Sequence, residues 1–241
     1  MSELATQATQ DYLKVIYQVC EDHGRASTGQ IADELGVTPA SVTGMLKKLA
    51  ASEPALLSYR KHQGAVLTPE GERLALQIIR SHRLLECFLH DTLGYAWDEV
   101  HEEAERLEHA ISGPLGRRIA DLLQEPEHDP HGAPIPTRDL QLPADCSVPL
   151  DELTPGQDAC VKRVSDRDPQ LLRYLAEISL IPGTELTLLQ PLPFSDHVRL
   201  RYGGGNESII ISARVARQVF VIPHQRTGEA GNTTASLQEN S

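Results

Sequence analysis

Residues 28–49 read TGQIADELGVTPASVTGMLKKL. Apolar residues recur at helical spacing on both sides of Gly36, as expected for two short amphipathic helices. Thr38 followed by Pro39 is typical of a helix start, because a threonine side chain caps free backbone amides and proline suits the first turn. Two short helices joined by a glycine-containing turn predict a helix-turn-helix.

The flanking segments extend this unit. Residues 9–20 carry apolar side chains with a helical period, which predicts a helix before the pair. Residues 56–67, LLSYRKHQGAVL, place two apolar runs around a polar tip and therefore predict a β-hairpin. A hairpin directly after a helix-turn-helix favours a winged helix that binds DNA. The alternative is a plain helical hairpin with no role in DNA binding.

The distribution of charge bears on DNA binding. The 241-residue chain has a formal net charge of −12, which taken alone argues against a nucleic-acid partner, because DNA attracts basic proteins. Residues 38–64, however, carry a net charge of +3, on the second helix and the hairpin tip, where phosphates would lie. The candidate DNA contacts are Thr38, Pro39, Ala40, Ser41, Thr43, Lys47, Lys48, Arg60 and Lys61.

The rest of the chain predicts helices followed by strands. Periodicity and capping indicate helices at about 68–92, 98–112 and 115–123, and residues 125–150 read as a loop. Turn residues then separate short strands, which predict a small β-barrel with one helix near 169–178. The strands are expected at 159–164, 185–190, 197–202, 208–212 and 219–222. We therefore predict a mainly α fold with a small β-barrel, divided into 1–73 (winged helix), 74–150 (helices with a linker), 151–224 (barrel) and 225–241 (disordered tail).

Carboxylates and histidines gather on residues 98–109. On a helix, four of these side chains fall within about 100° of one another and share a face, which leaves like charges unpaired unless a cation lies there. Oxygen and imidazole ligands without thiolate favour Mn(II) or Fe(II). The alternative is a solvated acidic helix face. The candidate ligands are His101, Glu105, Glu108 and His109 on this helix, and His82 and Glu86 on the preceding one.

The remaining histidines and the cysteines show no comparable pattern. No two cysteines form a CxxC motif, so reduced thiols and a cytoplasmic protein are expected. No apolar run is long enough to span a membrane, and the first residues lack a secretory signal pattern. We expect ordinary surface or loop histidines at His23, His62, His90, His128, His131, His197 and His224.

Taken in order, these segments resemble the DtxR/MntR family of metal-dependent transcriptional repressors, over roughly residues 5–223. The motif LIPGT (180–184) resembles the FeoA-type, SH3-like domain of the longer members. The resemblance rests on QDYLKVIY (10–17), SVTGMLKKL (41–49), LTPEG (67–71), RSHRLLE (80–86), HEEAERLEH (101–109), PHGAPIP (130–136) and LIPGT (180–184).

The resemblance implies a homodimer that binds a palindromic operator in double-stranded DNA and mainly represses metal-uptake or metal-homeostasis genes. It assigns metal binding and dimerisation to residues 74–150 and implies about two ions per subunit. The primary site would use Asp11, Glu105, Glu108 and His109, and the ancillary site His82, Glu86 and His101 with a barrel ligand, Asp168 or, as second choice, Gln170.

The resemblance also bears on the choice of metal. Iron-sensing members have a methionine at the position of Asp11 and a cysteine at that of Glu105, so oxygen at both places favours Mn(II), with Fe(II) as the alternative. Some manganese members have an acid where this chain has Lys14.

Two interpretations from other classes compete with a regulator. A carboxylate-bridged metal enzyme needs Glu-x-x-His on each of two helices, but Glu86 is followed at +3 by Leu89 and Glu105 by Glu108. We therefore expect no enzyme, no small-molecule substrate and no membrane partner. A metal storage or chaperone protein that does not bind DNA stays open as the second alternative.

Overall fold

The structure is a computed structural model that describes residues 6–191, 196–202 and 208–224. The helix-turn-helix and its wing are present as predicted. The N-terminal part consists of α1 (Gln7–His23), α2 (Thr28–Leu35), α3 (Pro39–Ala50) and a hairpin of β1 (Leu57–Arg60) and β2 (Gly64–Leu67).

Local sequence explains where these helices begin. Ser27 and Gln30 form a reciprocal capping box at the start of α2. The Thr38 side chain accepts a hydrogen bond from the Ser41 amide at the start of α3, and Pro39 occupies the first turn. The apolar faces of the helices and the hairpin form one core, which includes Leu13, Ile16, Ile31, Val42, Leu46 and Leu57.

The central part is helical, with a shorter acidic helix than predicted. It contains α4 (Pro69–Cys87), continued by the π-helical turn η2 (Phe88–Thr92), then α5 (Val100–Leu107) and α6 (Gly113–Leu122). The sequence predicts one helix over 98–112, but α5 ends at Leu107 and the Ala110 amide donates to the Leu107 carbonyl oxygen in a turn. Glu108 and His109 therefore lie in the turn after α5 rather than on its face.

The C-terminal part is an antiparallel sheet. The predicted barrel does not close within the described ranges, because the strand order β3-β8-β4-β5-β6-β7 leaves β3 and β7 at the edges. The predicted tail, 225–241, lies outside the described residues. The elements are β3 (Val148–Pro149), η3 (Leu150–Glu152), β4 (Gln157–Val164), α7 (Pro169–Glu177), β5 (Glu185–Pro191), β6 (His197–Tyr202), β7 (Ser208–Ser212), α8 (Ala213–Ala216) and β8 (Val219–Pro223).

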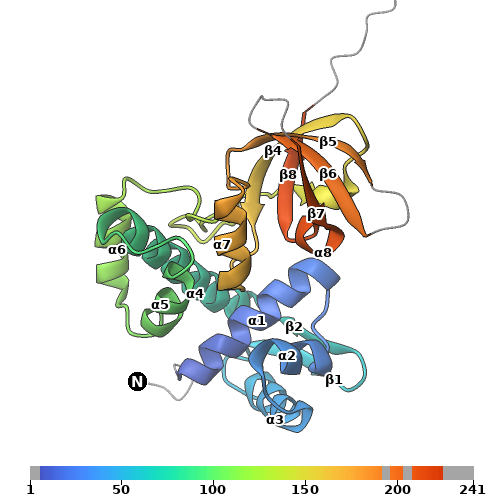
Figure 1. Ribbon diagram of the computed structural model, residues 1–241. Coiled ribbons are helices and arrows are strands. Elements are labelled where there is room, and N and C mark those ends of the chain that lie inside the picture. The colour runs from blue at the N-terminus through green and yellow to red at the C-terminus, as the bar shows by residue number, and fades with distance from the viewer. Residues whose placement is uncertain (1–5, 192–195, 203–207, 225–241) are drawn as a thin grey trace, which may run out of the picture.

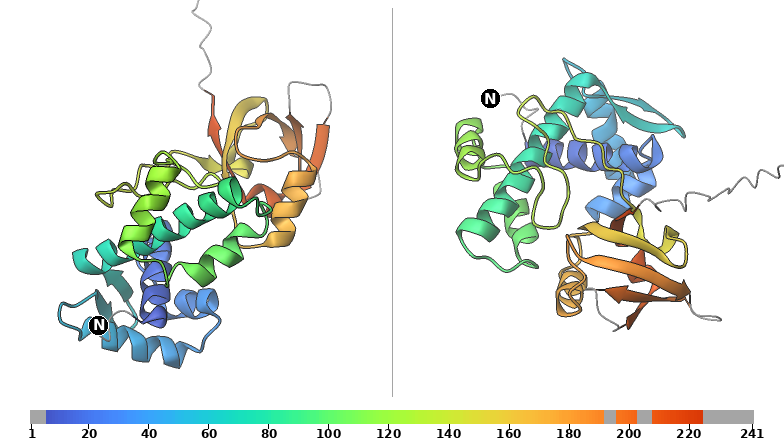
Figure 2. Two further views of the ribbon diagram at one scale, coloured as in Figure 1. Left: turned by 90° about the vertical axis from the view of Figure 1, so that its left-hand side faces the viewer. Right: turned by 90° about the horizontal axis from the view of Figure 1, so that it is seen from above.

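The three parts meet at α4. Figure 1 shows the winged helix at one end of the molecule and the sheet at the other, with α4 and α5 between them. Residues 123–147, here called the connecting loop, run from α6 to the sheet without a regular helix or strand (Figure 2). Each part has its own hydrophobic core. Within the described ranges, no helix combines the length and apolar character needed to cross a membrane.

Candidate metal centre

Helix α4 places two candidate ligands on one buried face. His82 and Glu86 are one turn apart, and His82 Nε2 lies 3.0 Å from Glu86 Oε1. Helix α5 presents His101 opposite them, with Nδ1 3.1 Å from Glu86 Oε1 and 3.2 Å from His82 Nε2. The structure thus brings together the three side chains that the sequence analysis assigned to the ancillary site.

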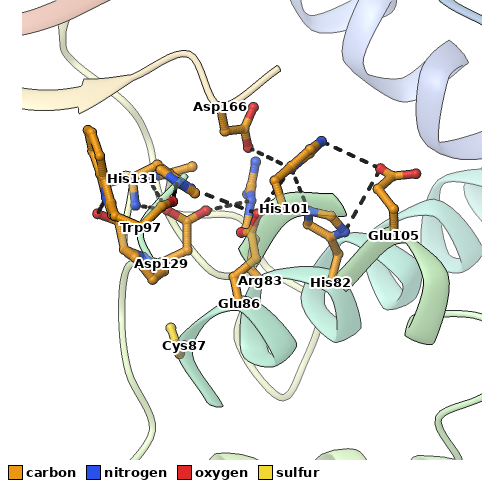
Figure 3. Close-up of polar contacts among 12 residues, drawn as sticks. His82, Arg83, Glu86, Cys87, Trp97, His101, Glu105, Asp129, His131 and Asp166 are labelled. Atoms are coloured by element: carbon orange, nitrogen blue, oxygen red, sulfur yellow. Dashed lines mark hydrogen bonds and ion pairs between the residues drawn. The ribbon is translucent and has the colours of Figure 1, made fainter. Parts of the chain in front are cut away.

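A carboxylate from the C-terminal part reaches the same place. Asp166 follows β4, and its Oδ2 atom lies 3.4 Å from His101 Nδ1. Figure 3 shows Asp166 pointing toward His101 from a segment that approaches α4 and α5. The ligand atoms of His82, Glu86, His101 and Asp166 all lie within 4.8 Å of one another.

The connecting loop brings further ligands to the other side of Glu86. The side chains of Asp129 and His131 are fully buried there, and His131 Nδ1 lies 3.8 Å from Glu86 Oε1 (Figure 3). The Trp97 carbonyl oxygen accepts a hydrogen bond from His131 Nε2 at 2.9 Å. Nε2 therefore carries a proton, and Nδ1 faces Glu86, as in a metal-binding histidine held by a backbone carbonyl.

Three buried atoms at this place have no hydrogen-bond partner among the described residues. They are Glu86 Oε2, Asp129 Oδ2 and His131 Nδ1. Arg83 Nε lies 3.6 Å from Asp129 Oδ2, beyond hydrogen-bonding distance. Because buried polar atoms are nearly always satisfied, this donor set fits a divalent cation. The Glu86 group is defined here as His82, Glu86, His101, Asp129, His131 and Asp166.

The charges of the Glu86 group depend on one another. Burial alone would lower the pKa of His82, but the carboxylates of Glu86 and Glu108 raise it to about 9. Hydrogen bonds with Asp166 and Glu86 likewise outweigh burial and raise the pKa of His101 to about 10. Burial opposes the charge on Glu86, but both histidines lower its pKa to about 2. At neutral pH, protons on the two imidazoles therefore balance the carboxylates.

A second group forms where α1 meets the end of α5. Asp11 Oδ1 lies 2.9 Å from His109 Nε2, and Glu108 Oε1 lies 3.5 Å from the same nitrogen. The Gln10 amide oxygen accepts a hydrogen bond from His109 Nδ1 at 2.6 Å, which leaves Nε2 free to act as a ligand. The ligand atoms of Asp11, Glu108 and His109 lie within 4.8 Å of one another.

Lys14 separates Glu105 from these three ligands. The Lys14 ammonium donates to Glu105 Oε1 at 2.6 Å and to Glu108 Oε2 at 2.8 Å. Glu108 remains charged because hydrogen bonding to His82 and the charge of Lys14 outweigh burial and lower its pKa. The α1–α5 group is defined here as Asp11, Lys14, Glu105, Glu108 and His109.

The prediction that Asp168 supplies the ligand from the C-terminal part is wrong. Asp168 is exposed and caps α7, where its Oδ1 accepts hydrogen bonds from the amides of Gln170 and Leu171. The carboxylate that reaches the Glu86 group belongs to Asp166. The sequence holds a signal for this difference, because an aspartate directly before a proline in the first helical turn is a typical N-cap. Gln170 is exposed in the first turn of α7.

The expectation of an ordinary surface or loop histidine is wrong for His131. This side chain and that of Asp129 are buried, yet the segment around them has no periodicity that would indicate burial. A turn holds the pair in place: Asp129 Oδ1 accepts hydrogen bonds from the amides of His131 and Ala133. Burial and the charge of Glu86 raise the pKa of Asp129 well above its usual range.

The predicted DNA contacts lie on α3 and the wing. Apart from Thr43, which is half-buried, all of them are exposed. The hydroxyl of Thr43 donates to the Pro39 carbonyl oxygen, so it is partly engaged within α3. Arg25 adds a cation that the sequence analysis did not single out, because its Nε donates to the Gln63 carbonyl oxygen beside the wing tip. The roles of these residues stay predictions.

Binding of Mn(II) to the Glu86 group should release protons, because an imidazole must lose its proton before it can ligate a metal. The raised pKa values of His82 and His101, about 9 and 10, mean that both are protonated at pH 7. Affinity for Mn(II) should therefore increase as the pH rises toward 9, by about tenfold per pH unit for each proton displaced. Calorimetric titration in two buffers of different ionisation enthalpy measures the number of protons released.

The matched variants for this titration are His101→Gln and His90→Gln. The first should lower the number of protons released by about one, whereas the second changes a half-exposed histidine in η2 and should leave the number unchanged. Release of no protons by the unaltered protein would show that neither His82 nor His101 becomes a ligand.

Models of three protein families match successive parts of the chain. The iron dependent repressor N-terminal DNA-binding domain matches residues 5–65, and the iron dependent repressor metal-binding and dimerisation domain matches residues 68–137. The FeoA domain matches residues 148–223. Together these matches follow the three parts of the structure.

Individual proteins are similar over most of their own length. The HTH-type transcriptional regulator MntR of Bacillus pumilus (strain SAFR-032) is 36% identical over 121 residues, which are 50% of this chain and 82% of that protein. MntR of Listeria monocytogenes serotype 4a (strain HCC23) is 37% identical over 127 residues, 53% of this chain and 87% of that protein. A solved manganese-dependent transcriptional repressor in complex with manganese superposes with a TM-score of 0.82 at 39% identity, covering 88% of this chain and 98% of that one.

Proposed function

Because the chain belongs to the iron dependent repressor family that includes MntR, as its sequence resemblance predicted, we propose that it is a Mn(II)-dependent transcriptional regulator that binds DNA. It acts mainly as a repressor of metal-uptake or metal-homeostasis genes, and Fe(II) is the alternative ion. The observation that carries this proposal is the position of α1. This helix is part of the winged helix, and it also presents Asp11 to Glu108 and His109.

Two groups of ligands fit divalent cations. Carboxylate and imidazole donors without thiolate suit Mn(II), and the unsatisfied atoms around Glu86 support a cation there. In the Glu86 group, a bound ion would take the place of the imidazole protons that otherwise balance the buried carboxylates. We assign one ion to Asp11, Glu108 and His109, with Glu105 beside them. We assign a second ion to the Glu86 group, through His82, Glu86, His101 and Asp166, with Asp129 and His131 on the other side of Glu86.

The fold connects these ligands to DNA binding. Leu13 and Ile16 anchor α1 in the core of the winged helix, so joining Asp11 to Glu108 and His109 fixes the winged helix relative to α4 and α5. In a homodimer this arrangement sets the distance between the two copies of α3, the helix that would enter the major groove. That distance must match the spacing of successive major grooves in a palindromic operator. Affinity for metal and affinity for DNA are then reciprocally coupled.

A homodimer fits the apolar surface of the central helices. Leu115 and Leu122 on α6 are 51% and 61% exposed, which is costly for large apolar side chains unless another surface covers them. A cavity of about 540 Å³ lies beside α6, between it and parts of α1 and α4. We propose that a second copy covers this face.

The relatives are regulators rather than enzymes. A cytoplasmic location, where the DNA lies, belongs to the same proposal.

DNA binding by the full-length protein should depend on Mn(II). Selection from a random double-stranded library in the presence of Mn(II) should enrich an inverted repeat. The dissociation constant for that duplex should rise by about 100-fold when a chelator replaces the metal, within the range of typical allosteric coupling. Equally tight binding in chelator would contradict a metal-dependent regulator, and a stronger response to Fe(II) would favour the alternative ion.

Substituting the lysines of α3 distinguishes a DNA-binding regulator from a metal-storage protein. Lys47→Ala combined with Lys48→Ala should weaken DNA binding and reduce its salt dependence, while affinity for Mn(II) without DNA stays unchanged. Arg106→Ala is the matched control, because it removes an exposed cation from α5 rather than from α3. A storage protein would show no DNA binding for the lysine substitutions to weaken.

A further inference from the structure

The α1–α5 group contains a buried positive charge, the ammonium of Lys14. Lys14 lies on α1 with 7% of its surface exposed, although an ammonium is costly to bury unless other charges compensate it. Its Nζ atom lies 2.6 Å from Glu105 Oε1, 2.8 Å from Glu108 Oε2 and 3.2 Å from His82 Nδ1. These three side chains come from α4, α5 and the turn after α5.

The partners of Lys14 have the composition of a metal site. The ligand atoms of His82, Glu105 and Glu108 lie within 4.8 Å of one another, and two carboxylates with one imidazole suit a divalent ion. The Lys14 ammonium contacts all three, so a cation already occupies this position. Glu108 also belongs to the neighbouring set with Asp11 and His109, so two ions here would form a close pair bridged by one carboxylate.

We propose that the Lys14 ammonium serves as a permanent, covalently attached cation of the α1–α5 group and restricts this group to one divalent ion. The inference rests on the proposed function and deepens it. The charges agree with one ion: when the His82 proton is counted with the Glu86 group, Asp11, Glu105 and Glu108 contribute −3 and Lys14 contributes +1, so the formal charge of the α1–α5 group is −2. One divalent ion neutralises that charge, whereas two would leave an excess positive charge beside the ammonium in a largely buried place.

Lys14 also determines how the carboxylates are divided. Glu105 Oε1 accepts from the ammonium at 2.6 Å, and its side chain is 44% exposed, whereas that of Glu108 is fully buried. Lys14 therefore holds Glu105 on the side facing His82 and leaves Asp11, Glu108 and His109 as the protein ligands of the single ion. In this role Lys14 is a positioning residue, and it bonds α1 to α5 whether or not the ion is present.

The test counts Mn(II) in the full-length protein by equilibrium dialysis with elemental analysis and examines the bound ions by electron paramagnetic resonance. The unaltered protein should bind about two Mn(II) per chain, without the half-spaced hyperfine lines of an exchange-coupled pair. Lys14→Glu makes the formal charge −4, so it should bind about one more Mn(II) and show those lines. Lys14→Arg keeps the charge and should behave as the unaltered protein.

A third variant keeps the inference testable if Lys14→Glu does not fold. Lys14→Met preserves the length of the buried chain and removes its charge, so Mn(II) should bind the α1–α5 group at least about tenfold more tightly. A coupled pair in the unaltered protein, or unchanged affinity in Lys14→Met, overturns the inference while metal-dependent DNA binding stands. Loss of Mn(II)-dependent DNA binding in the unaltered protein would instead be a failure of the proposed function.

Discussion

Asp11→Asn should abolish the effect of Mn(II) on DNA binding. Among the proposed ligands, Asp11 is the one that α1 contributes, so the variant retains metal-binding residues but loses the connection through the ion to the winged helix. The ion pairs of Lys14 also join α1 to α5, but they do not depend on metal. In Mn(II), the dissociation constant for the selected duplex should rise by about 100-fold, to the value measured in chelator. The measurement is a fluorescence anisotropy titration of the duplex with and without Mn(II).

The fold should survive this substitution. The Asp11 side chain is 32% exposed, and an amide of the same shape can still contact His109. Asp22→Asn is the matched control, because it changes an exposed carboxylate near the end of the same helix. Dialysis should show that Asp11→Asn still loads the Glu86 group. Retention of the full Mn(II) response would mean that α1 is fixed by contacts other than this ligand.

Of the substitutions proposed here, Gly132→Ala should lower the free energy of unfolding most. It should also abolish metal binding by the Glu86 group. Gly132 has a φ of 90°, and a Cβ atom there would lie 2.1 Å from the Lys162 carbonyl oxygen, a backbone atom of β4. The adjacent His131 carbonyl oxygen accepts a hydrogen bond from the Val164 amide, so the loop is fixed against the strand. Strain and overlap together should lower the free energy of unfolding by about 2–5 kcal/mol.

Urea unfolding and Mn(II) stoichiometry measure the two consequences. Because His131 precedes the displaced residue directly and Asp129 lies three positions before it, Gly132→Ala should lose about one Mn(II) per chain. Gly156→Ala separates the effects, because Gly156 has a φ of 80° but no atom within 4 Å of the added Cβ. It should cost about 1–2 kcal/mol from backbone strain alone and keep both ions. Equal costs for the two variants would contradict the close approach of the loop to β4.

The sequence allowed the winged helix to be predicted because its determinants are local. Helical spacing of apolar residues, the cap at Thr38 and the polar hairpin tip act within a few residues of one another. The pairing of His82 with Glu86 on α4 is local in the same sense, since a single helical turn fixes their proximity. The end of α5 was harder to predict, because no glycine or proline follows Leu107 before Gly113, yet the backbone turns at Glu108.

The contacts that complete the candidate site are long-range. Lys14 meets Glu105 across 91 positions of sequence, and no pattern within α1 indicates that its ammonium would be buried. Asp129 and His131 belong to an aperiodic loop whose position depends on docking against β4. Asp166 and Asp168 look equivalent by composition, and only the capping preference of a residue before proline distinguishes them. Packing between separate parts decides these positions.

The position of Asp166 has a consequence for how the molecule unfolds. Its neighbour Arg167 forms an ion pair with Glu34 on α2, so one short segment contacts both the Glu86 group and the winged helix. The three hydrophobic cores consist of separate sets of residues, but the proposed ligands come from all three parts. An ion that binds only when every part is folded adds its binding free energy to the stability of each. Manganese would thus convert three semi-independent folding units into one cooperative unit, whose melting temperature reports the metal concentration.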